Sequence, residues 1–201
     1  MIGVTNIYSK SSPMKKLTAC CLFIIGLTYS CTAQFYKSLL PNDAFTDSLA
    51  IIVQDFNSNF TNIEGKLFET TNDMDVYRSK TVLPGALHCS IYRSHSKEDL
   101  SASWHAIMYE GENYDRALKM YKQIVREVKK SNISKTTEEQ VFFIGEMENP
   151  KPSVRFTVTT LKLKINEQIF QNFYAEIELV GSFDGWMVQL NLHNKKQVTA
   201  E

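Results

Sequence analysis

The residues with the chemistry for catalysis are one cysteine and the histidines near it in sequence. His88 and Cys89 are neighbours on a predicted strand, where successive side chains point to opposite faces, so His88 is unable to activate the thiol. His105, on the next predicted strand, reaches Cys89 only if the pairing register allows. The pattern instead places Cys89 with Leu87 and Ile91 on an apolar face, where a cysteine acts as a small hydrophobe. We therefore predict a core cysteine and no catalytic residue, the alternative being a small hydrolase or transferase site near Cys89 and His105.

A metal site is the second chemistry that the histidines suggest, because His88 and His105 lie on consecutive predicted strands and could face each other. Zinc or iron requires a third and usually a fourth ligand, and no Asp or Glu lies on those strands before Glu110. His95 and His193 lie elsewhere in the chain. The sequence also lacks the Walker, dinucleotide-binding, HExxH, GxSxG and CxxC patterns. We predict no metal and no cofactor.

The segment MKKLTACCLFIIGLTYSCTAQ, residues 14–34, has the features of an export signal. Two lysines precede an apolar core at 17–29, and small residues stand before Gln34, as signal peptidase requires. Cleavage between Ala33 and Gln34 is predicted, so that residues 1–33 form the signal, with Met1 and Met14 as the two alternative starts of translation. An exported, periplasmic or secreted, protein follows from this interpretation.

Two alternatives to cleavage remain open. Residues 28–31 resemble a lipid-attachment signal that would anchor the protein through Cys31, although a threonine stands where leucine is preferred. A retained membrane span is less well supported, since the uncharged run contains several hydroxyl residues and a span requires about 20 mainly apolar ones. We predict no stable membrane span after cleavage.

Cleavage would also change the composition. Three of the four cysteines, Cys20, Cys21 and Cys31, leave with the signal, so the mature chain has no internal disulfide. The remaining 22 acidic and 19 basic residues give a net charge of −3. A mildly acidic domain lacks the basic surface that nucleic acids require, so a nucleic-acid partner is excluded.

Two helices are predicted. An apolar stripe from Phe45 to Ile63 predicts the first, which follows a stop and cap at Pro41-Asn42-Asp43 and is capped at its end by Gly65, with Asp47 and Asp55 in solvent. The second spans about Tyr114 to Lys130, with a stripe at Ala117, Tyr121, Ile124 and Val128, and we interpret Lys119, Lys122 and Arg126 as a solvated outer face.

The remaining elements are predicted strands joined by short connections. They are expected near residues 66–69, 76–83, 86–93, 103–109, 154–165, 173–179 and 186–192. A change of apolar parity predicts a bulge near Thr159 and Thr160, Asn166 and Glu167 are expected to form a hairpin turn, and Trp186 is expected to be buried. The order is helix, strands, helix, strands, with connections of hairpin length, which argues against βαβ crossovers. Residues 34–201 are therefore predicted to form a single α+β domain. Its expected form is a two-layer sandwich of a mostly antiparallel sheet with two helices packed on one face.

The segments MYEGENYDRALKMYKQI and GSFDGWMVQL, with the short Met-Lys-Lys signal, resemble uncharacterised small exported α+β proteins of Bacteroidota-type bacteria. The resemblance implies export and a compact fold, and it carries over no functional residues. We therefore expect an exported, non-enzymatic binding or structural module whose partner is a protein, a peptide or a lipid.

Overall fold

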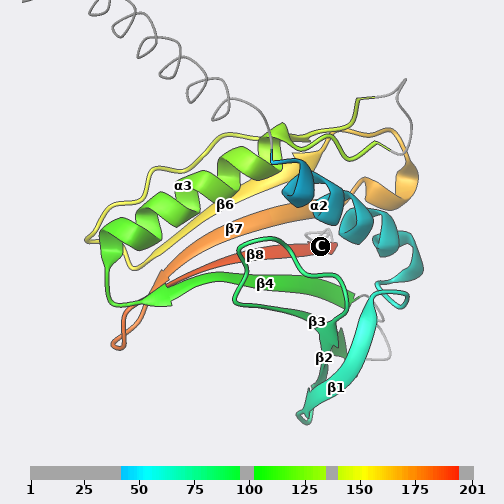
Figure 1. Ribbon diagram of the computed structural model, residues 1–201, viewed down its shortest axis with the longest axis horizontal. Coiled ribbons are helices and arrows are strands. Elements are labelled where there is room, and N and C mark those ends of the chain that lie inside the picture. Colours follow the sequence, from blue (N-terminus) through cyan, green and yellow to red (C-terminus); the bar gives the residue numbers. More distant parts are fainter. Residues whose placement is uncertain (1–41, 96–101, 135–139, 195–201) are drawn as a thin grey trace, which may run out of the picture. The chain divides into compact units, whose positions relative to one another are not determined.

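The structure is a computed structural model that describes residues 42–95, 102–134 and 140–194. These residues form one antiparallel sheet of eight strands and two α-helices, α2 (Asp43–Asp55) and α3 (Tyr114–Lys130) (Figure 1). The α+β class is therefore confirmed. The predicted signal, with Cys31, Ala33 and Gln34, lies outside the described residues. Within the described part of the chain, no helix is both long and apolar enough to cross a membrane.

The strands follow one another across the sheet except at one crossing. Their order is β1-β2-β3-β4-β8-β7-β6-β5. After β4 the chain forms α3, crosses to the far edge and returns strand by strand, so that β8 pairs with β4 at the centre. The bounds are β1 Glu64–Thr70, β2 Met74–Ser79, β3 His88–Ser94, β4 Ala102–Gly111, β5 Phe143–Ile144, β6 Phe156–Leu163, β7 Phe173–Gly181 and β8 Trp186–Asn194.

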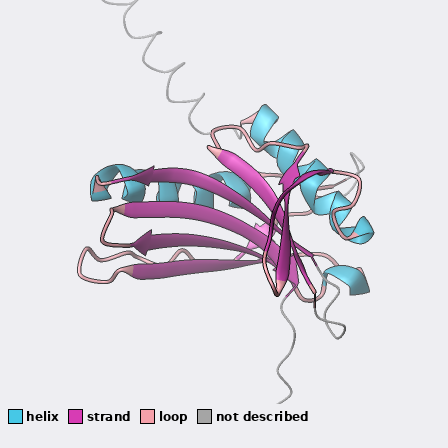
Figure 2. Ribbon diagram, turned by 90° about the horizontal axis from the view of Figure 1, so that it is seen from below, coloured by secondary structure: helices cyan, strands magenta, loops and turns pink. Residues whose placement is uncertain are grey.

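Alternation along the central strands divides the sheet into two faces. Inward residues such as Trp104, Ile177 and Leu190 are fully buried and join the side chains of α2 and α3 in one apolar core. We call this side the helix face. The opposite side, the open face, carries the intervening polar side chains of β4, β7 and β8. Figures 1 and 2 show that the sheet is strongly bent, with β1 to β3 turning away from the long strands.

Helix α3 has the predicted bounds. Its first turn is capped by the Asn113 side chain, whose Oδ1 accepts a hydrogen bond from the Arg116 amide at 3.0 Å. The predicted stripe is buried, and the helix packs against β4, β7 and β8. Of the predicted basic face, Lys119 and Arg126 are exposed and Lys122 is partly buried.

The prediction for the first helix was wrong at its end. α2 stops at Asp55 and is followed by the 3₁₀ turn η1 (Phe56–Ser58), while Gly65 lies inside β1. Asn59 and Phe60 take positive φ values of 54° and 60°, which a helix does not allow. Asp55, expected in solvent, is buried, and its Oδ2 accepts a hydrogen bond from the Ile63 amide at 3.2 Å. The carboxylate thus fixes the turn that ends the helix.

Two predictions about β6 and its connection were also wrong. The β6–β7 register runs without a shift from Phe156 to Lys162, so there is no bulge. Thr159 itself takes the inward position and is fully buried, with its hydroxyl hydrogen-bonded to that of Tyr121. The parity changed in the sequence because Val154 and Phe156 are exposed although they are apolar, and because a threonine stands at a core position. The predicted tight turn at 166–167 is a longer connection that contains η2 (Gln168–Phe170).

Trp186 and Leu87 are less buried than predicted. Trp186 is partly buried at the end of β8, with its ring 4.8 Å from that of Tyr114. Leu87 precedes β3 and is 59% exposed. Both residues lie where the sheet ends, and alternation alone does not show where the covering helices stop.

Candidate functional site

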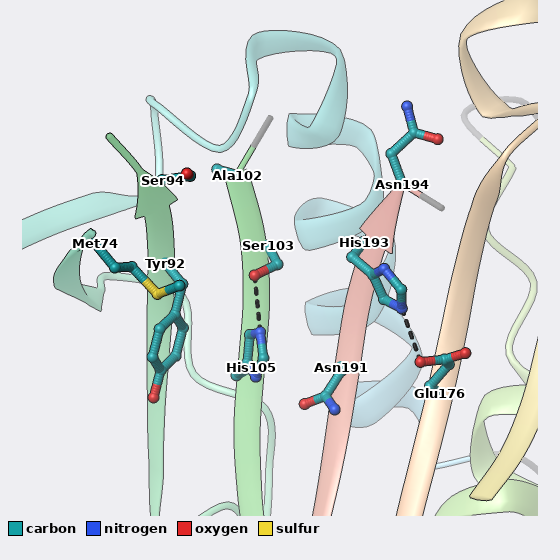
Figure 3. Close-up of a pocket in the computed structure, with 10 residues that line it drawn as sticks. All are labelled: Met74, Tyr92, Ser94, Ala102, Ser103, His105, Glu176, Asn191, His193 and Asn194. Atoms are coloured by element: carbon teal, nitrogen blue, oxygen red, sulfur yellow. Dashed lines mark hydrogen bonds and ion pairs between the residues drawn. The ribbon is translucent and has the colours of Figure 1, made fainter. Parts of the chain in front are cut away.

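The open face is hollowed at one end of its central strands. This polar hollow has a volume of about 360 Å³ and is formed by side chains from β2, β3, β4, β7 and β8 (Figure 3). Its lining consists of Met74, Tyr92, Ser94, Ala102, Ser103, His105, Glu176, Asn191, His193 and Asn194. The volume falls in the usual range of small-ligand sites, about 300–1,000 Å³.

The strand register explains why these polar side chains meet. In neighbouring strands, residues directly opposite each other point to the same face. His105 of β4 lies opposite Asn191 of β8, which in turn lies opposite Glu176 of β7. Tyr92 and Ser103 are opposite each other on β3 and β4. Segments distant in sequence therefore bring one polar row together.

His105 is held neutral by its surroundings. Its ring lies 4.4 Å from the Tyr92 ring, measured between centroids, and its Nε2 is 2.8 Å from the Ser103 hydroxyl. Burial, with a contribution from the charge of His193, lowers the pKa of His105 to about 4. A histidine with so low a pKa is a weak general base at neutral pH. The Ser103–His105 pair is therefore better suited to hydrogen bonding than to activating a nucleophile.

Glu176 carries the negative charge of the polar hollow and is already engaged. One carboxylate oxygen lies 2.9 Å from His193 Nε2, and the other accepts a hydrogen bond from the Thr160 hydroxyl at 3.2 Å. Figure 3 shows the imidazole and the carboxylate turned toward each other. These contacts hold both side chains in place along the β7–β8 side of the polar hollow.

Asn191 is the most informative residue of the site. It is buried, with 6% of its surface exposed, and its Nδ2 donates to Glu178 at 2.9 Å. A second donor, Gln189, reaches the same carboxylate at 2.6 Å. Among the described residues the Oδ1 of Asn191 has no hydrogen-bond partner. A buried acceptor without a partner typically costs about 1–3 kcal/mol, so this oxygen indicates a place for a donor that the described chain does not supply.

The structure does not bring Cys89 and His105 together. Cys89 lies opposite Ala106 and is buried among apolar side chains, whereas His105 points to the open face. Burial raises the pKa of the Cys89 thiol, which makes it a poor nucleophile. The site near Cys89 and His105 that the alternative interpretation required is therefore not formed.

The other histidines do not form a metal site with His105. His88 is exposed and lies opposite Ile107 rather than His105, and His95 is close to Asp75, with 3.2 Å between Nε2 and Oδ1. Over residues 42–95, 102–134 and 140–194, no three His, Cys, Asp or Glu side chains are grouped so as to hold a metal ion.

A second hollow, of about 450 Å³, lies at the β1–β3 end of the sheet. Its wall is mainly apolar and includes the exposed side chains of Phe68, Val82 and Leu87. In the described chain, neither of the two buried polar atoms without a partner belongs to it. Its wall also carries polar side chains, Glu69, Arg78 and His88 among them, but none of them has the buried unpartnered atom that distinguishes the polar hollow.

Sequence reasoning missed the residues that form the polar hollow. It predicted strands at 173–179 and 186–192, but it did not connect Glu176 with Asn191, His193 and Ser103. The available signal was the strict alternation on β7 and β8, which places Glu176 and Asn191 on the same face once the strands are paired. The pairing of β8 with β4 was the missing information.

Comparison with known proteins gives no relative. The chain matches no family model, no curated protein and no solved structure.

Proposed function

We propose that this protein is an exported, non-enzymatic binding module whose binding site is the polar hollow. The observation that supports it best is the buried Asn191 oxygen without a partner, inside a hollow where polar side chains from several strands converge. Export is proposed on the basis of residues 14–34, with cleavage before Gln34.

The proposed architecture agrees with this function. We take the domain to be a two-layer sandwich with both helices on one face, because α3 packs on β4, β7 and β8 and α2 packs against α3. The helix face then supplies the stability of the domain, and the open face remains accessible to a ligand. With stability supplied by the helix face, the polar residues of the open face would serve binding rather than packing.

The proposal is tested by a thermal-shift screen of the whole protein against neutral, anionic and cationic small molecules. A ligand that binds only the folded state raises the melting temperature with its concentration. We expect at least one compound to do so with the wild-type protein and to lose the effect with Asn191→Leu and with Ser103→Ala. Lys162→Ala is the matched control, because Lys162 is exposed on β6 outside the polar hollow.

Two results would argue against the proposal. If active compounds stabilise all variants equally, the polar hollow is not the binding site. If a compound is consumed by the wild-type protein and not by Ser103→Ala, the module is an enzyme and the non-enzymatic assignment fails.

A further inference from the structure

We propose that the polar hollow binds a neutral, hydroxyl-rich ligand, a sugar ring, which donates a hydrogen bond to the free Asn191 oxygen. This inference rests on the proposed binding function and adds the class of the ligand. It depends on the orientation of Asn191, on the charges of the lining and on the groups beside Asn191.

The orientation of Asn191 is fixed by its neighbour. Glu178, as a carboxylate, only accepts hydrogen bonds, so the amide nitrogen of Asn191 must face it at 2.9 Å. The carbonyl oxygen is then left on the other side, where the described chain gives it no donor. Because this oxygen is itself closed to solvent in the structure, a ligand reaches it only when a neighbouring side chain moves aside, and the ligand must then bring an O–H or an N–H group.

The charges of the lining argue against an ionic ligand. No Lys or Arg is among the described residues that form the polar hollow, so an anion would meet the Glu176 carboxylate with no Lys or Arg to attract it, and His193 is already engaged with that carboxylate. A cation would have to compete for Glu176 with His193 and Thr160, which already contact both of its oxygens. A neutral ligand avoids both penalties.

The groups beside Asn191 suit hydroxyl groups in particular. Because burial lowers the pKa of His105 to about 4, its ring is neutral and carries one donor and one acceptor nitrogen. The hydroxyl of Ser103, 2.8 Å from Nε2, rotates to match either tautomer. A ligand hydroxyl both donates and accepts hydrogen bonds, so it can pair with Ser103 and His105 whichever tautomer the His105 ring takes.

An apolar wall completes the match. The Tyr92 ring, which contacts the His105 ring, and the side chain of Met74 line the β2–β3 side of the polar hollow (Figure 3). A sugar ring has a face of C–H groups and a rim of hydroxyl groups. The first would rest on Tyr92 and Met74 while the second reaches Asn191 and Ser103.

The decisive experiment varies ligand charge on a constant ring. Isothermal titration of the full chain at pH 7 would use glucose, galactose and mannose, each beside its amino sugar and its uronate. We expect at least one neutral sugar to bind with millimolar affinity and its two charged counterparts to bind about tenfold more weakly or worse. The β-methyl glycoside of that sugar separates two sources of the ligand: equal affinity indicates the end of a glycan, and weaker affinity indicates a free sugar, both in support of the inference.

The variants place the sugar in the polar hollow. Asn191→Leu is expected to weaken binding about tenfold or more, because it removes the acceptor, and Lys162→Ala is expected to leave the affinity unchanged. Ser103→Ala, a smaller change, keeps the test decisive if Asn191→Leu fails to fold. Absence of binding by all three neutral sugars overturns the inference, as does tighter binding of an amino sugar or a uronate. If an amino sugar or a uronate binds more tightly and Asn191→Leu abolishes that binding, the proposed binding function still stands although the inference about a neutral ligand fails.

Discussion

Acidification should destabilise this protein through His105. In the unfolded chain a histidine titrates near pH 6.5, whereas in the folded protein burial and the charge of His193 lower the pKa of His105 to about 4. Between these values the unfolded state binds one proton more than the folded state, so stability is complete above about pH 6.5 and falls as the pH is lowered toward 4. Because each pKa unit corresponds to about 1.4 kcal/mol, the loss is on the order of 3 kcal/mol.

The assay compares urea unfolding of the wild type and His105→Gln at a series of pH values, followed by the fluorescence of the buried Trp104. Groups that titrate independently of His105 contribute to both curves and cancel in the difference. From pH 7 to pH 4, the wild type should lose about 3 kcal/mol more of its free energy of unfolding than His105→Gln loses. His88→Gln, which removes an exposed histidine of β3, provides the baseline for the loss of an imidazole.

A change below about 1 kcal/mol, less than the effect of one pKa unit, would refute the reasoning. It would mean that water reaches the His105 ring and that the polar hollow does not hold it neutral. The titration of the His105 ring protons by NMR gives an independent measurement of the same pKa.

Further predictions concern the core, the end of α2 and the signal. Cys89→Ala should cost about 1–2 kcal/mol in urea unfolding, and a thiol reagent should label the native protein slowly; rapid labelling would contradict the burial. Asp55→Ala should cost about 1–3 kcal/mol, because the buried amide of Ile63 loses its acceptor, and an unchanged midpoint would mean that water replaces the carboxylate. Trp186→Ala should cost about 2 kcal/mol, below the range for fully buried aromatic residues; a cost near zero would show that the Tyr114 contact is absent in solution. Mass spectrometry of exported protein should find Gln34 as the first residue, and an acylated Cys31 would favour the lipid anchor instead.

The sequence alone determined the elements whose pattern is local. The stripe at Ala117, Tyr121, Ile124 and Val128, which has helical spacing, predicted α3 with its observed bounds. Alternation on β7 predicted which side chains face the core. In both cases the pattern repeats over many residues, and burial on one side is its only cause.

Tertiary structure decided where such patterns stop. The apolar stripe of the first helix continues to Ile63, and all its members are buried, yet the helix ends at Asp55 because a buried carboxylate holds a turn there. The sequence pattern of β6 gave a wrong parity at Thr159, a polar residue at a core position. Its hydroxyl group can be buried there because it is hydrogen-bonded to the hydroxyl of Tyr121, on a helix distant in sequence. Periodicity records burial, and it does not distinguish a helix from a turn that buries the same side chains.

The candidate site depended on tertiary structure altogether. His105, Asn191 and Glu176 lie on three strands, and only the pairing of β8 between β4 and β7 places them in one row. In the sequence, only the alternative interpretation located a site, near Cys89 and His105, because a cysteine beside a histidine is conspicuous. The unpartnered oxygen of Asn191 exists only in the folded chain, since an amide in the unfolded state is satisfied by water.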